Sequence, residues 1–99
     1  MEHHQEDNDR DKIDVKIKTP AGHSAEFDIN TDWTVDEVIK KAEEHFVDLG
    51  QLQAGDYNLV LINQDGTTVQ LAGSAKVEES GIKHDAELAL VLAGPQVDG

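Results

Sequence analysis

The sequence predicts an α+β roll, in which a sheet of four to five strands packs on one α-helix. Three observations predict it. Five short segments have the composition and alternation of strands, only one segment has helical spacing over a useful length, and that segment follows the second strand. Because one helix can cover only one face of a sheet, a doubly wound fold is excluded. The length of 99 residues fits a single domain.

The first two strands are expected to form a hairpin. Residues 12–19 alternate apolar and polar side chains, and residues 24–31 do the same. Between them, residues 20–23 contain a proline and a glycine, which are typical of turns. Pairing of the two segments gives one apolar face, made of Ile13, Val15, Ile17, Ala25, Phe27 and Ile29.

The helix is expected over residues 35–48. Thr34 and Glu37 have the spacing of a capping box, in which each side chain bonds the backbone N–H of the other residue. Gly50 is a natural C′ residue and predicts the end of the helix. Between these signals the apolar residues recur at helical spacing: Val35, Val38, Ile39, Ala42 and Phe46.

Three more strands are expected after the helix. The first is apolar on both faces from Leu59 onward, which is typical of a central strand or of one that contacts a partner. The dipeptide Asp65-Gly66 predicts the turn into the second strand. An irregular stretch, residues 72–86, separates the second strand from the third. The three strands are residues 57–62, 67–71 and 87–92.

The charge of the chain limits its partners. Asp and Glu number 21 against 8 Lys and Arg, which gives a net charge of −13 at pH 7. Residues 1–11 are polar and strongly acidic, and we expect them to form a disordered arm. Affinity for nucleic acid and for anionic membranes depends on positive charge, so neither is an expected partner. A basic protein surface is the natural complement.

Most kinds of catalytic and metal site are excluded by composition. The chain has no Cys, which rules out disulfides, thiolate zinc sites and a cysteine nucleophile. His23, His45 and His84 are too scattered to form a ligand set, and no phosphate loop or catalytic triad signature occurs. We therefore expect no metal, no cofactor and no enzymatic activity. With neither a membrane-spanning run nor a signal peptide, a monomer in the cytoplasm is expected.

Four segments together resemble ubiquitin, and more closely the small bacterial ubiquitin-like proteins that accompany activating, conjugating and deconjugating enzymes. They are the opening strand KIDVKIKT, the helix start DWTVDEVIKKA, the strand YNLVLI with its Asp-Gly turn, and ELALVL followed by a tail that ends in glycine. The resemblance implies the β-grasp fold over residues 12–92, with a mixed sheet whose first and last strands are parallel neighbours. It also implies a flexible conjugation tail, residues 93–99.

The resemblance implies that the chain is a protein modifier. Its Gly99 carboxylate would be activated with ATP, passed to an enzyme nucleophile and transferred to a target amine as an isopeptide. The implied partners are activating and conjugating enzymes, a deconjugating protease and modified target proteins. Ubiquitin-type tails end in Gly-Gly after an arginine-containing segment, whereas this tail has Gly94 and ends in Val97, Asp98 and Gly99. Two alternatives stay open: a non-conjugated β-grasp adaptor, and a sulfur carrier thiocarboxylated at Gly99.

A surface patch is the second candidate site. If Leu59 faces the helix, Val60 and Ile62 face away from it, and Ala89 and Val91 join them from the last strand. Ubiquitin-like proteins present an apolar patch on this face to their partners, and Val60 and Val91 match its positions best. Clustered apolar groups on a surface indicate an interaction site.

Overall fold

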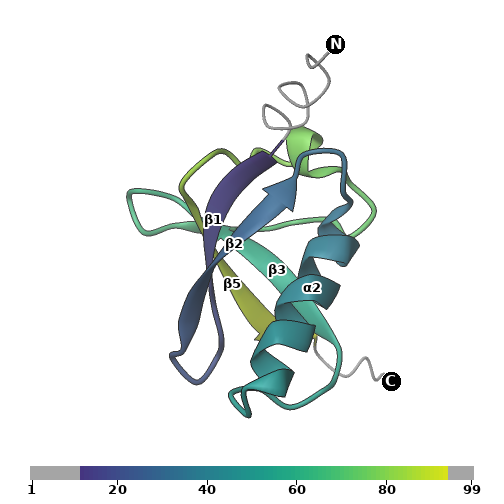
Figure 1. The fold of residues 1–99 in the computed structure, drawn as a ribbon. Helices are drawn as coiled ribbons and strands as arrows, with labels where there is room; N and C mark the ends of the chain where they lie inside the picture. Colours follow the sequence, from purple (N-terminus) through teal and green to yellow (C-terminus); the bar gives the residue numbers. More distant parts are fainter. Residues whose placement is uncertain (1–11, 94–99) are drawn as a thin grey trace, which may run out of the picture.

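The computed structural model describes residues 12–93 and contains one sheet with one α-helix across it (Figure 1). The predicted arm, residues 1–11, and residues 94–99 of the predicted tail lie outside the described residues. In chain order the elements are β1 (Lys12–Lys18), β2 (Ser24–Asn30), α2 (Val35–Asp48), β3 (Tyr57–Ile62), β4 (Thr68–Gln70), the 3₁₀ turn η1 (Val77–Glu79) and β5 (Ala86–Leu92).

The five strands are ordered β2-β1-β5-β3-β4. β1 and β5 lie parallel in the middle of the sheet, and the other neighbouring pairs are antiparallel. A parallel pair needs a long crossover, and here α2, β3 and β4 all lie between β1 and β5 in the chain. The predicted α+β roll with a mixed sheet and central first and last strands is confirmed.

α2 begins and ends at the predicted residues because local chemistry marks both ends. The Thr34 hydroxyl accepts from the Glu37 N–H at 3.3 Å, and the Glu37 carboxylate accepts from the Thr34 N–H at 3.0 Å. This is the predicted capping box. At the other end Gly50 has a φ of +73°, a left-handed conformation that glycine adopts without strain.

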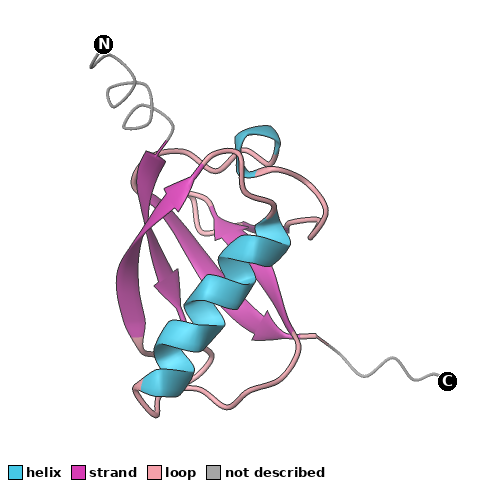
Figure 2. Ribbon diagram, turned by 45° about the vertical axis from the view of Figure 1, so that its right-hand side comes forward, coloured by secondary structure: helices cyan, strands magenta, loops and turns pink. Residues whose placement is uncertain are grey.

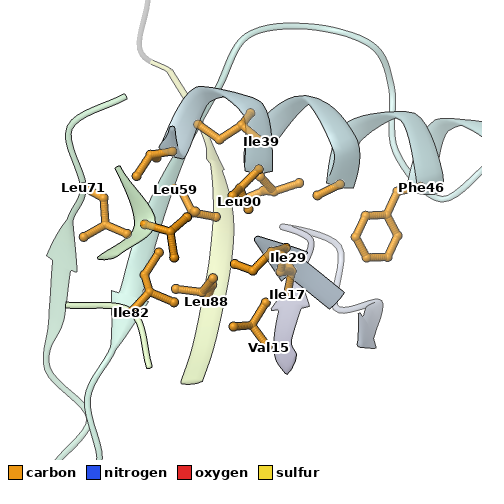
Figure 3. Packing of buried hydrophobic residues seen from close by; sticks show 14 residues of the cluster. Val15, Ile17, Ile29, Ile39, Phe46, Leu59, Leu71, Ile82, Leu88 and Leu90 are labelled. Atoms are coloured by element: carbon orange, nitrogen blue, oxygen red, sulfur yellow. The ribbon is translucent and has the colours of Figure 1, made fainter. Parts of the chain in front are cut away.

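The core lies between the inner face of the sheet and α2, which crosses that face in Figure 2. Figure 3 shows the leucines of β3 and β5 beneath the helix, beside the apolar side chains of β1. Fully burying such a side chain stabilises the fold by about 1.5–3 kcal/mol. The buried apolar residues are Val15, Ile17, Ile29, Val35, Val38, Ile39, Ala42, Phe46, Leu59, Leu71, Val77, Ile82, Leu88 and Leu90.

Four of the five strands differ slightly from the predicted bounds. β1 and β2 each end one residue early, at Lys18 and Asn30. β4 spans three residues rather than 67–71, because Thr67 belongs to the preceding turn: its hydroxyl and its N–H both donate to the Asp65 carboxylate. Leu71 is buried and its N–H donates to the Leu59 carbonyl at 2.9 Å, so it pairs with β3 just past the end of β4. β5 begins one residue early, at Ala86.

Candidate functional site

The outer face of the sheet is the side that α2 leaves uncovered. Side chains alternate along each strand, so the register of β3 and β5 decides which residues reach that face. Leu59 lies opposite Leu90 and both are buried beneath α2. One residue further along, Val60 lies opposite Ala89. Val60 and Ala89 therefore point outward.

The structure brings the four predicted patch residues together on this outer face. Val60 and Ala89 form a direct cross-strand pair, Ile62 follows on β3 and Val91 follows on β5. All four are half-buried, since neighbouring strands cover their flanks while one side stays open. We call this set, Val60, Ile62, Ala89 and Val91, the outer-face patch.

Polar side chains border the outer-face patch on both sides. On β1, Lys18 is in register with Ala89, and Lys16 is in register with Glu87. On β4, Gln70 lies opposite Val60 and Thr68 lies opposite Ile62. An apolar centre with a polar rim is the usual composition of a protein–protein contact surface.

β5 leads from this face toward the C-terminus. The N–H of Ala93 donates to the Asp56 carbonyl at 3.0 Å, which fixes the chain at the end of the sheet. Leu92 lies opposite Tyr57 and is 66% exposed, because it borders an open hollow with Pro20 and Leu52 instead of lying under α2. The predicted tail residues Gly94, Val97, Asp98 and Gly99 lie outside the described residues.

Sequence reasoning missed a carboxylate pair on the outer face. Asp14 of β1 lies directly opposite Asp28 of β2. The pKa of Asp14 is raised above its ordinary value of 3.8, first because its side chain shares a hydrogen bond with Asp28, and further because Asp28 carries like charge. The alternation within each strand placed both aspartates on the polar face. Only the hairpin register, which sequence patterns do not give, places them opposite each other.

The loop before β5 closes onto this pair. The imidazole Nδ1 of His84 accepts from the Asp14 N–H at 3.2 Å, and the Asp85 N–H donates to the Asp14 carbonyl at 2.6 Å. The His84 Nε2 lies 3.6 Å from an Asp85 carboxylate oxygen. Asp85 has a φ of +68°, which is unusual for a residue other than glycine. These bonds connect the loop before β5 to Asp14, near the start of β1.

The other histidines of residues 12–93 are structural or exposed. The His45 and Phe27 rings make an edge-to-face contact, with centroids 5.1 Å apart. His23 is exposed, and its N–H donates to the Thr19 hydroxyl at 3.1 Å. Within residues 12–93, no three metal-ligating side chains gather into a group that could hold an ion. Over the same residues, no helix is long and apolar enough to cross a membrane.

Comparison with known proteins identifies the fold. The sequence matches no protein family and no curated protein. In structure, the chain is similar to a protein designed de novo on the basis of ubiquitin, with a TM-score of 0.65, 19% identity, and coverage of 88% of this chain and 98% of that chain. The fold is the ubiquitin-like β-grasp.

Two further solved structures agree on this β-grasp. One, described as "Molecular Mimicry of SUMO promotes DNA repair", has a TM-score of 0.60 and 16% identity over 83% of this chain and 92% of that chain. The other belongs to a "pParkin-pUb-UbcH7 complex", with a TM-score of 0.62 and 16% identity over 84% of this chain and 23% of that chain. At these identities the likeness concerns the fold.

Proposed function

We propose that this β-grasp protein is a modifier that becomes attached to target proteins through the carboxylate of Gly99. The observation that carries the proposal is the ubiquitin-like fold, in which β5 lies in the middle of the sheet and leads directly to the C-terminal residues. A modifier of this kind supplies the acyl group and a recognisable surface. Its partners supply the catalytic groups, so the chain is not itself an enzyme.

The proposed chemistry begins at the terminal carboxylate. An activating enzyme would let a Gly99 carboxylate oxygen attack the α-phosphate of ATP, which forms an acyl adenylate and releases pyrophosphate. An enzyme thiolate then displaces AMP, and a target amine displaces the thiolate to form the isopeptide. Glycine suits both displacements because it has no Cβ to obstruct the approach to its carbonyl. Because the reaction consumes ATP, we place it in the cytoplasm.

The outer-face patch would bind the partner enzymes and the readers of the modification. It is apolar, lies on the face that α2 leaves open, and is rimmed by polar residues. An adaptor that is never conjugated would use the same patch, whereas a sulfur carrier would use the same carboxylate. The three functions therefore differ in what happens at Gly99.

Intact-protein mass spectrometry tests the proposal. The full chain is incubated with ATP and a ubiquitin-type activating enzyme from the same organism, with and without a conjugating enzyme and candidate targets. An isopeptide adduct at Gly99 supports the modifier. A stable thiocarboxylate would contradict it in favour of the sulfur carrier, and the absence of any adduct would contradict it in favour of the adaptor.

Two tail variants sharpen this experiment. Gly99→Ala should strongly reduce adduct formation, since its methyl group hinders attack at the carbonyl. Asp98→Ala asks whether the acidic penultimate residue is recognised. If a basic site in the activating enzyme reads it, activation should slow by about tenfold to a hundredfold, as for the loss of one charge-assisted hydrogen bond. An unchanged rate would show that Asp98 carries no signal.

A further inference from the structure

We propose that the partner docking on the outer-face patch places a basic segment, rich in arginine, beside its apolar contact, over the end of the sheet that carries Glu87, Asp14 and Asp28. The inference rests on the proposed function only for its premise that this face meets a partner protein. It adds the chemistry of that partner and its orientation on the sheet.

The apolar end of the face carries little negative charge. In the row formed by Lys18, Ala89, Val60 and Gln70, the lysine is the one charged side chain. The other cross-strand neighbour of Lys18 is Ser24, so no carboxylate is in register with it. A basic group of the partner would be repelled at this end of the face.

The opposite end of the face is acidic. Glu87 lies opposite Ile62, at the border of the outer-face patch. Lys16 lies in register with both Glu26 and Glu87, so one positive charge faces two carboxylates. The next outward-facing residues on β1 and β2 are Asp14 and Asp28. Along β1, Lys18 and Asp14 are four residues apart, which is about 13 Å at about 3.3 Å per residue.

Within residues 12–93, no lysine nitrogen lies within 4 Å of a carboxylate at this end, although Lys12 and Lys16 lie on the same face of β1 as Asp14. Among residues 12–93, the only contact within 4 Å between a basic side chain and a carboxylate is that of the His84 imidazole with Asp85, at 3.6 Å, and both side chains are largely exposed. Like charges directly opposite on antiparallel strands destabilise a sheet, and Asp14 and Asp28 are such a pair. A cationic group from a partner would turn this repulsion into attraction. The charge pattern therefore favours a basic occupant.

A hollow beside the outer-face patch fits an arginine side chain. It measures about 590 Å³, is open to solvent and lies between the end of β3 and the loop before β5. Leu61, Ile62 and Ala86 offer apolar walls for the aliphatic stem. Asp85 and Glu87 offer two carboxylates for the guanidinium group, against the single positive charge of Lys83, which also lines the hollow. Because Ile62 belongs to both the hollow and the patch, one partner segment can occupy both.

Two synthetic peptides test the inference. Both are amphipathic helical peptides with leucines along one side; one ends in three arginines and the other ends in three citrullines, which keep the shape but lose the charge. Binding to the ¹⁵N-labelled full chain is followed by NMR. The arginine peptide should shift the amides of Val60, Ala89 and Glu87 and should bind about tenfold more tightly, because each exposed ion pair contributes a factor of about 1.5 to 5. Salt should weaken its binding.

A matched pair of variants separates local recognition from overall charge. Glu87→Gln and Glu44→Gln each remove one negative charge, but Glu44 lies on the exposed side of α2, away from the outer face. Glu87→Gln should weaken the arginine peptide about twofold to fivefold, whereas Glu44→Gln should leave its affinity unchanged.

Three results would overturn the inference: equal affinity of the two peptides, equal effects of the two variants, or shifts confined to other surfaces. These outcomes are independent of the proposed function, because the peptide assay does not involve Gly99. If the chain forms adducts at Gly99 but binds the arginine and citrulline peptides equally well, only the inference is contradicted. A chain that selects the arginine peptide but never forms an adduct contradicts only the modifier.

Discussion

Replacing two neighbouring residues of β3 by alanine tests the register on which the site depends. Leu59 is 0% exposed and faces Leu90 in the core, whereas Val60 is half-buried on the opposite face, beside Ala89. Leu59→Ala removes buried methyl groups and leaves a cavity, which costs about 2–5 kcal/mol. Val60→Ala removes fewer atoms from a surface that is already partly wet, and should cost less than about 1 kcal/mol.

Urea unfolding, read by circular dichroism, measures both costs, and a change in midpoint at constant slope reports a change in stability. In a thermal melt the expected loss of about 3 kcal/mol for Leu59→Ala corresponds to a Tm lower by about 12–24 °C, while Val60→Ala should lower it by less than about 8 °C. If Val60→Ala costs as much as Leu59→Ala, β3 is paired one residue out of register. Every outward residue would then be inward, and the outer-face patch would not exist.

The N-terminal cap of α2 and the Asp14–Asp28 pair give two further predictions. Thr34→Ala should destabilise the fold by about 1 kcal/mol in urea unfolding, because the first turn of α2 loses a hydrogen-bond acceptor, whereas Thr34→Ser keeps the hydroxyl and should be nearly neutral. The raised pKa of Asp14 means that the folded state holds a proton more tightly than the unfolded state, so this contribution to stability is present below pH 3.8 and is lost as the pH rises through the raised pKa. Asp28→Asn removes the like charge and should therefore stabilise the chain at neutral pH relative to the original, with the difference shrinking in acid; equal unfolding midpoints at neutral pH would contradict the assigned pair.

Local signals explain why α2 was predicted to the residue. Thr34, Glu37 and Gly50 mark the two ends of the helix through contacts within three to five residues, and such contacts are readable from sequence. The end of the turn before β4 was harder to predict. There the Asp65 carboxylate accepts hydrogen bonds from both the hydroxyl and the N–H of Thr67, so Thr67 stays in the turn. Local hydrogen bonds between side chain and backbone compete with strand pairing, and an apolar–polar pattern does not reveal them.

The candidate site was predictable only in part, for a related reason. Alternation of side chains places Val60 and Ile62 on one face, and a sheet with one covering helix leaves one face open. The bond from the Asp14 N–H to His84 joins residues 70 positions apart. No periodicity in either segment points to such a contact, because it depends on where a loop of several residues returns to the sheet.

The half-buried apolar residues of the outer face are not needed to hold the sheet together. The inner face supplies the core, and Leu59, Leu88 and Leu90 are committed to it by register. An outward Val60 could be replaced by threonine at small cost in stability, because an exposed flank already keeps it in contact with water. Clustered apolar side chains on a surface also invite association. Stability and solubility would thus both favour polar residues at these positions. The apolar residues found there are those that the proposed contact with a partner requires, and in that proposal the acidic end of the same face sets the orientation of the partner.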